Sequence, residues 1–343
     1  MSIFKSAILS FLIVLLTLYN QGGVLAKPLI PDGFYNDVTK EDGLVRTIEY
    51  KNGQPNGRFR VFYSDGRIKS MGTYLNGYVE GMVQGYYPDG KLEFKSFYRK
   101  GRLHGISYLY YPSGRVNQEI AYINGLREGK STEYSEKRRP VTERPFLSGL
   151  ENGMQKDFYP NGQVYRESRY SNGKQDGLIQ EYYKSGTLKA VNMGYDNKRQ
   201  GPGKEYDESG ALHLEGIWKE DLLTGTARLY YPSQRLKSEV NFKDGLMHDD
   251  PYQILYESGE LLSTGTVILG KREGTYQEFY KNKKLKREGS YKNGLEEGVF
   301  KNYSDRGFVS SDDFYENGVL LNQTRYNQDG KIIGENFYYQ EPR

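Results

Sequence analysis

The stretch YLNGYVEGMVQGYYPDGKLEFKSFY, from Tyr74 to Tyr98, recurs along the chain in steps of 24 residues. Counting in that step from Tyr50 finds an aromatic residue in eight of nine copies, and Gly194 is the exception. A glycine recurs with the same step, without a break, from Gly57 to Gly225. The chain is therefore a tandem array, and one repeat unit decides its fold.

Two turn signals divide each copy. The segment YYPDG, from Tyr86 to Gly90, places proline, aspartate and glycine where a tight turn uses a fixed φ, a side-chain acceptor and a positive φ. The second signal is an Asn-Gly or related pair, as in LNGYVEG from Leu75 to Gly81. The stretches between these turns are about six to eight residues long, which suits strands and is too short for helices. Each copy is therefore predicted to form one β-hairpin.

The side chains repeat in a way that stacked hairpins explain. The first strand of a copy ends in an aromatic pair, such as Tyr86 and Tyr87, and adjacent strand residues face opposite sides of a sheet. Like residues on successive hairpins stabilise a sheet pair by pair. We predict an all-β fold, an elongated single-layer antiparallel sheet of about twelve tandem 24-residue β-hairpins over residues 43–339. A lead-in at 27–42 precedes this array, and a tail at 340–343 follows it.

The N-terminal segment differs in composition from the repeats. Lys5 precedes an apolar run from Ala7 to Leu18, which is shorter than the roughly 20 residues that a membrane-spanning helix needs. A charged start, a short apolar centre and small residues up to Ala26 are typical of a secretory signal peptide over residues 1–26. An uncleaved membrane anchor is the alternative. We expect an exported chain, in the periplasm, the cell envelope or the extracellular space.

Composition excludes several classes of function. The formal net charge of the whole chain is +4, and a surface so nearly balanced does not suit a nucleic-acid partner. The chain has no cysteine, which excludes disulfides, thiolate metal sites and a cysteine nucleophile. Tyrosine is abundant at 33 residues, and its ring can be buried while its hydroxyl reaches water. Stability is therefore expected from packing and backbone pairing.

The repeat pattern YxNGxxxGxxxxYYxxGxLxxxxxY resembles the MORN variant repeat, in the form found in the bacterial YwqK antitoxin-like family. The resemblance covers residues from about 43 to 339. It implies a single-layer antiparallel sheet of consecutive hairpins, and scaffold, protein-partner, membrane-associated or antitoxin roles. It brings no catalytic residues.

The ionisable residues that could carry chemistry fall into repeat positions. His104 and His248 occupy one position, six steps apart, which other copies fill with polar residues, as expected for a side chain that hydrogen-bonds the turn backbone. His213 lies at an exposed strand position. His248 with Asp249 and Asp250 could bind a divalent cation, but three loop neighbours make an incomplete site. We predict no enzyme, and no catalytic, cofactor or metal site.

Irregular copies are better candidates for function, because the common fold does not require their differences. In the fourth copy Arg138 replaces the turn glycine, and Pro140 and Pro145 enter the second strand, which predicts a local break or bulge. The alternative is a basic patch for an acidic partner or an anionic headgroup. Its residues would be Lys137, Arg138, Arg139 and Arg144.

A second basic cluster lies around a turn of the tenth copy, and it could contact phosphate or an acidic protein. Solvated lysines are the simpler interpretation of this cluster. Its residues are Lys281, Lys283, Lys284 and Lys286.

Many similar hairpins without a catalytic constellation favour an exported scaffold that binds a protein partner of unknown identity. Binding of a cell-envelope glycan through rows of tyrosine is one alternative, and anionic-lipid binding through the two basic clusters is another. An antitoxin or immunity role fits less well, because a protein that neutralises a toxin inside its producer should remain in the cytoplasm.

Overall fold

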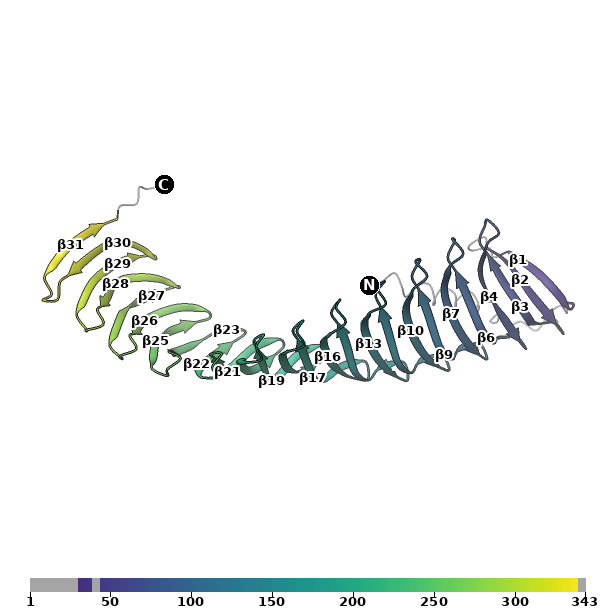
Figure 1. The fold of residues 1–343 in the computed structure, drawn as a ribbon, viewed down its shortest axis with the longest axis horizontal. Helices are drawn as coiled ribbons and strands as arrows, with labels where there is room; N and C mark the ends of the chain where they lie inside the picture. The colour runs from purple at the N-terminus through teal and green to yellow at the C-terminus, as the bar shows by residue number, and fades with distance from the viewer. Residues whose placement is uncertain (1–29, 39–43, 339–343) are drawn as a thin grey trace, which may run out of the picture. The chain divides into compact units, whose positions relative to one another are not determined.

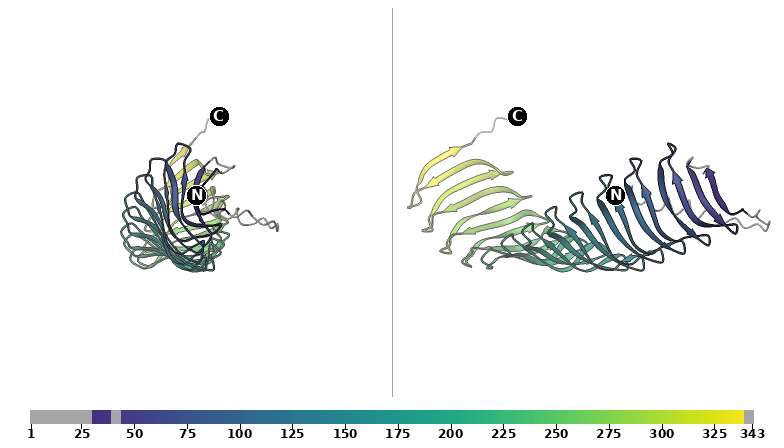
Figure 2. Two further views of the ribbon diagram at one scale, coloured as in Figure 1. Left: turned by 90° about the vertical axis from the view of Figure 1, so that its right-hand side faces the viewer. Right: turned by 45° about the vertical axis from the view of Figure 1, so that its right-hand side comes forward.

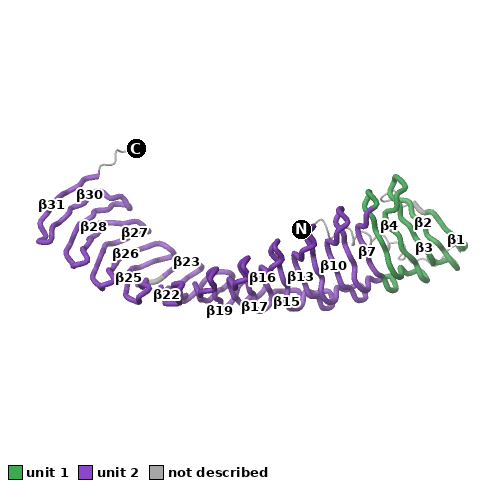
Figure 3. The backbone as a smooth tube through the Cα atoms, viewed as in Figure 1, with its two compact units in different colours: residues 1–90, 98–101 green, residues 91–97, 102–343 purple. Residues whose placement is uncertain are grey.

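A computed structural model of the chain describes residues 30–38 and 44–338, and these form strands and turns with no helix (Figure 1, Figure 2). The predicted signal segment and the tail at 340–343 lie outside the described residues. Contacts divide the chain into two units, residues 1–90 with 98–101 and residues 91–97 with 102–343 (Figure 3).

Unit 1 is an antiparallel sheet in which β1 to β4 pair in chain order, and β5 and β6, two pieces of one strand, both pair with β4. Its first strand, β1, lies within the predicted lead-in and pairs with β2 from Gly33 opposite Tyr50 to Val38 opposite Val45. The strands are β1 (Gly33–Val38), β2 (Val45–Lys51), β3 (Gln54–Phe62), β4 (Ile68–Leu75), β5 (Tyr78–Val79) and β6 (Gly81–Tyr86).

Unit 2 repeats the same order of hairpins, and its strands pair in chain order. The first of its strands, β7 (Leu92–Arg99), has its last two residues in unit 1. The others are β8 (Arg102–Leu103), β9 (Gly105–Tyr110), β10 (Val116–Ile123), β11 (Leu126–Arg127), β12 (Gly129–Tyr134), β13 (Pro140–Leu147), β14 (Leu150–Glu151), β15 (Gly153–Phe158), β16 (Val164–Ser171), β17 (Lys174–Tyr182), β18 (Leu188–Tyr195), β19 (Lys198–Tyr206), β20 (Leu212–Lys219), β21 (Leu222–Tyr230), β22 (Leu236–Lys243), β23 (Leu246–Met247), β24 (Asp249–Leu255), β25 (Leu261–Ile268), β26 (Lys271–Phe279), β27 (Leu285–Lys292), β28 (Leu295–Tyr303), β29 (Val309–Glu316), β30 (Val319–Tyr326) and β31 (Ile332–Phe337).

Twelve hairpins run from β3 to β31, so the predicted all-β hairpin array is confirmed. In five of them the first strand is broken into two short pieces, as in β8 and β9. The break falls directly before the repeated glycine position, which Asp249 fills in one of the five hairpins, and Gly105 at this position has a φ of 92°. A glycine suits this position because a positive φ is costly for residues with a Cβ.

The Asn-Gly pairs form two-residue turns in which both central residues have positive φ, as in a type I′ turn. Asn124 has a φ of 51° and Gly125 one of 89°. The Gly125 N–H then donates to the Leu103 carbonyl of the preceding hairpin, at 2.8 Å. This turn is thus tied to the preceding hairpin by a backbone hydrogen bond.

The fourth hairpin keeps its pairing despite its unusual sequence. Arg138 takes the glycine position with a φ of 60°, so the turn is retained at some conformational cost. Pro140 lies at the register shift beside this turn, and Pro145 pairs with Lys130. The Pro145 carbonyl accepts the Asn152 N–H beside the second bulge, where a missing proline N–H is tolerated. The second strand, β13, is therefore continuous despite its two prolines, and the predicted irregularity is a bulge of the kind that other copies share.

Aromatic rings fill the places that glycines leave open. Phe300 is fully buried and makes edge-to-face contacts with Tyr291 and Tyr315, with ring centroids 5.4 and 5.5 Å apart. A Cβ placed on Gly289 would lie 2.4 Å from a Phe300 ring atom, far inside van der Waals contact. The aromatic stack therefore requires a glycine at residue 289.

Replacing Gly289 with alanine should lower the free energy of unfolding by about 1–3 kcal/mol, because the Phe300 ring must shift. Urea unfolding followed by circular dichroism measures the change. Gly334→Ala is the matched control, since its Cβ would meet only the flexible end of Arg325, and we expect it to stay within about 0.5 kcal/mol. Equal stabilities of the two variants would show that the ring does not need this space.

Tyrosine hydroxyls join successive hairpins. The second residue of the aromatic pair donates its hydroxyl to the main-chain carbonyl at the end of the next hairpin's first strand. Tyr159 bonds the Tyr182 carbonyl and Tyr280 the Tyr303 carbonyl, both at 2.8 Å. The same bond recurs in both units, from Tyr63, Tyr111, Tyr183, Tyr231 and Tyr256. The abundance of tyrosine thus has a structural cause.

Tyr159→Phe and Tyr280→Phe should each destabilise the chain by about 1 kcal/mol, because each removes one half-buried hydrogen bond and keeps the ring. The exposed Tyr195 provides the control, and Tyr195→Phe should leave the urea midpoint unchanged. Wild-type midpoints for all three variants would mean that water replaces the lost donor at no cost.

Candidate functional site

The basic cluster of the fourth hairpin is divided by the structure. Lys137, Arg138 and Arg139 lie together and exposed at the turn that joins β12 and β13. Arg139 donates from Nη1 to the Pro160 carbonyl of the next turn at 2.6 Å. Arg144 lies on β13 instead, with its Nη1 3.6 Å from Glu151. Within the part of the chain that the structure describes, only Lys137 and Arg138 of these four make neither a side-chain hydrogen bond nor an ion pair.

The tenth hairpin also uses most of its lysines internally. Lys281 Nζ lies 5.7 Å from the ring centroid of Tyr256, and Lys284 Nζ donates to the Arg306 carbonyl at 2.8 Å. Lys286 Nζ lies 2.6 Å from Glu278 Oε1. Lys283 lies at the turn with a φ of 67°. These four residues are therefore not four equivalent free cations.

The contacts of Arg139 and Lys284 belong to a general pattern that was not predicted from the sequence. A basic residue directly after the turn donates to a carbonyl of the following turn in several hairpins. Arg115 Nη1 bonds the Glu136 carbonyl at 2.5 Å, and Arg235 Nη1 bonds the Glu257 carbonyl at 3.0 Å. Basic residues at this position could have been found as a repeat series, but their acceptors could not.

At the repeat position of the two histidines, glutamates bond the turn backbone as predicted, but His104 Nδ1 is buried and has no hydrogen-bond partner within the described structure. Glu128 Oε2 accepts the Ser148 N–H at 2.7 Å, and Glu297 Oε2 accepts the Asn317 N–H at 3.0 Å. The side chains of Asp249 and Asp250 lie outside what the structure describes, and the possible cation site beside His248 lies there with them. Among the described residues, no group of three or more histidine or acidic side chains has the geometry to hold a metal ion.

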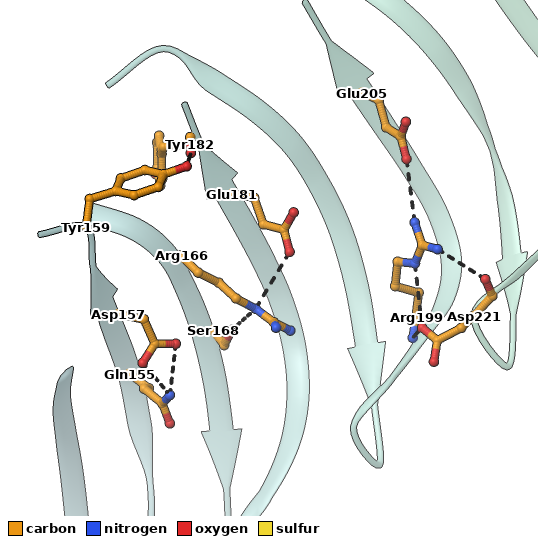
Figure 4. Close-up of polar contacts among 10 residues, drawn as sticks. All are labelled: Gln155, Asp157, Tyr159, Arg166, Ser168, Glu181, Tyr182, Arg199, Glu205 and Asp221. Atoms are coloured by element: carbon orange, nitrogen blue, oxygen red, sulfur yellow. Dashed lines mark hydrogen bonds and ion pairs between the residues drawn. The ribbon is translucent and has the colours of Figure 1, made fainter. Parts of the chain in front are cut away.

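A polar pocket of about 500 Å³ lies over strands β17 to β20. Its lining includes Glu181, Ala190, Asn192, Arg199, Glu205 and Asp207. Arg199 contacts Glu205 and Asp221, with nitrogen–oxygen distances of 3.5 Å to each (Figure 4). Its lining residues do not stand out in the sequence, because the repeat pattern does not show which side chains face each other across strands.

One acidic group at the edge of the pocket is held in its charged form. The pKa of Asp207 is lowered by a hydrogen bond from the Ser209 hydroxyl and by bonds from the N–H groups of Ala211 and Ser209. The Asp207 carboxylate therefore already accepts hydrogen bonds within the turn that follows β19. Fewer of its acceptor positions remain for a ligand.

A row of apolar side chains lies exposed beside two successive Asn-Gly-type turns. Ile123 and Leu126 flank one turn, and Leu147 and Leu150 flank the next. Their exposed fractions are 50%, 54%, 53% and 50%. We call these four residues the apolar turn row. The row lies beside the fourth hairpin, at the opposite end of its strands from Lys137 and Arg138.

Tyrosine–carboxylate hydrogen bonds perturb titration along the sheet. Tyr230 donates to Glu215 and Tyr303 donates to Glu288, both at 2.6 Å. Burial, together with these bonds to a carboxylate, raises the pKa of each tyrosine to about 12. The same bond from Tyr230 lowers the pKa of Glu215. These shifts are explained by contacts that the repeat itself makes.

Stability should fall at alkaline pH because of these tyrosines. Their pKa is higher in the folded chain, about 12 against 10.0, so their contribution is fully present below about pH 10 and is lost as the pH rises through about 12. Urea unfolding across that range measures the loss. A double variant, Tyr230→Phe with Tyr303→Phe, should show a shallower decline, and an unchanged slope would contradict the assignment.

Comparison with known proteins supports the repeat assignment. Five segments match the MORN repeat variant, at residues 55–76, 79–100, 103–124, 151–172 and 272–293. These five segments are therefore MORN-variant repeats, in agreement with the tandem array of hairpins. No curated protein matches it.

Two solved structures give matches with low overall similarity. One is the Tc holotoxin pore of Photorhabdus luminescens, at 12% identity and a TM-score of 0.15, with 88% of this chain and 18% of that chain covered. The other is a porin-like protein from Bacteroides uniformis, at 10% identity and a TM-score of 0.13, with 86% of this chain and 95% of that chain covered. The chain thus spans less than a fifth of the holotoxin component.

In the described part of the chain, no helix is long and apolar enough to cross a membrane.

Proposed function

We propose that this MORN-repeat chain is an exported, non-enzymatic scaffold that binds a protein partner at the fourth hairpin. The observation that carries the proposal is the apolar turn row. Four aliphatic side chains, each about half exposed, lie beside adjacent turns and face solvent. Contiguous exposed apolar residues with a polar surround are typical of protein–protein contact surfaces.

Two cations at the other end of the same hairpin fit this proposal. Lys137 and Arg138 are exposed, and Arg138 holds its position through a left-handed backbone conformation at the turn. Arginine is favoured at interfaces because its guanidinium forms several directed hydrogen bonds. A partner with an apolar segment and an acidic patch would therefore match both ends of the hairpin.

Export and the absence of catalysis are parts of the same proposal. Export rests on the composition of residues 1–26, with its charged start and short apolar centre. The non-enzymatic assignment rests on the structural roles of the perturbed tyrosines and carboxylates, which the repeat explains. An antitoxin-like or immunity role, as in the YwqK-like family, would fit if the toxin acted outside the cytoplasm.

Leu126→Asp with Leu150→Asp should abolish partner recovery, because charged side chains would replace the apolar contact. The measurement is crosslinking and affinity recovery of the full chain from its native compartment, with quantification of the proteins recovered. Leu222→Asp with Leu295→Asp is the control, since both leucines hold the same repeat position in distant hairpins and are 46% and 47% exposed. Full recovery with the first pair, or equal loss with both pairs, would contradict a site at the fourth hairpin.

A further inference from the structure

We propose that the polar pocket over β17 to β20 binds a neutral saccharide. This second binding function is independent of the protein partner, because the pocket and the apolar turn row share no residue. The pocket volume of about 500 Å³ falls within the usual range for small-molecule sites and has room for one or two sugar rings.

A small residue opens the pocket. Ala190 pairs with Glu181 on one neighbouring strand and with Glu205 on the other, so its side chain lies between two carboxylates on one face of the sheet. The same repeat position varies along the chain: it holds Phe94 and Leu214 in two hairpins and serine in four others, Ser70, Ser238, Ser263 and Ser311. Ala190 is 5% exposed and leaves open the space that those larger side chains would fill.

A buried polar group lies in the pocket wall without a partner. Asn192 is 5% exposed, and its Oδ1 accepts no hydrogen bond within the described structure. It lies against Gly203, where a Cβ would be 2.2 Å from that oxygen. A buried acceptor without a donor costs about 1–3 kcal/mol. A ligand that orders a hydroxyl or a water at this group would recover part of that cost.

The charges of the pocket favour a ligand without net charge. Three carboxylates, of Glu181, Glu205 and Asp207, supply acceptors, while Lys189, Arg199 and His213 supply donors. Several of these charges already have partners. Arg199 is shared between Glu205 and Asp221, and Arg166 Nε lies 3.9 Å from Glu181 (Figure 4).

Neither sign of charge therefore dominates the pocket. Hydroxyl groups both donate and accept, so a sugar can use paired charged side chains that an ion would have to separate.

Two aromatic rings and a built-in reporter complete the arrangement. Tyr183 and Tyr206 line the pocket and offer apolar surface to the C–H faces of a sugar ring. The Arg199 guanidinium carbon lies 5.3 Å from the ring centroid of Trp218, the single tryptophan of the chain. Engagement of Arg199 by a ligand should therefore change tryptophan emission.

The test is titration of the full chain with glucose, galactose, N-acetylglucosamine and their β-linked disaccharides, followed by Trp218 emission and calorimetry. We expect a saturable response to at least one of these sugars. Ala190→Leu should weaken that binding at least about tenfold by filling the pocket, and Asn192→Ser should weaken it about tenfold by removing the amide. The fold should tolerate both substitutions, because other hairpins already have these residues at the same repeat positions. Leu214 corresponds to Ala190, and Ser168 corresponds to Asn192.

Thr142→Leu is the matched control, because Thr142 holds the repeat position of Ala190 in the fourth hairpin and is also buried. The Thr142→Leu variant should bind the sugar as the wild type does.

No response to any of these sugars would overturn the proposal, as would unchanged affinity in the Ala190→Leu and Asn192→Ser variants. A response to free glycine or free lysine without one to sugars would also overturn it and would assign the pocket to a zwitterion. Loss of partner recovery in the leucine variants bears on the scaffold alone, so the two proposals fail separately.

Discussion

Each unit of this protein is a single sheet, and among the described residues no second layer covers it. A hairpin can therefore bury its side chains only against the hairpins on either side of it. The tyrosine hydroxyl that bonds the next hairpin's carbonyl, as from Tyr159 to Tyr182, is the clearest form of this dependence. Stability in such an array is close to a sum of repeat and neighbour contributions, so each inter-hairpin contact matters locally.

This dependence decides which residues remain available for function. Many tyrosines, the turn asparagines and the basic residues after the turns make contacts that hold one hairpin to the next. Arg139 is an example, since it is exposed and charged, yet it donates to the Pro160 carbonyl. Exposure and charge alone are therefore weak signs of a binding site here. A stronger sign is a combination that few copies share, such as the exposed leucines Leu126 and Leu150 in the same hairpin region as Arg138, a cation that makes no ion pair among the described residues.

The sequence predicted the hairpins because their signals are local. Asn124 and Gly125 specify a two-residue turn by their own backbone preferences, whatever surrounds them. The candidate sites depend on contacts between hairpins, which a repeat pattern does not contain. Arg144 was grouped with Arg139 because they are close in sequence, but it lies along β13 and contacts Glu151. The polar pocket was missed for the same reason, since it depends on which side chains face Ala190 from both neighbouring strands.

A departure from the repeat does not by itself make a site. Gly194 is the position where the aromatic series fails, yet a Cβ there would lie 2.7 Å from Ile179 Cδ1, so a neighbour already fills the space. Ala190 lies at a position that varies along the chain, and its surroundings form a pocket because Glu181 and Glu205 pair with other charged groups instead of closing over it. Whether a missing side chain creates a binding site therefore depends on the chemistry of its cross-strand neighbours. Apolar neighbours close the gap to escape water, whereas charged neighbours remain hydrated and keep it open.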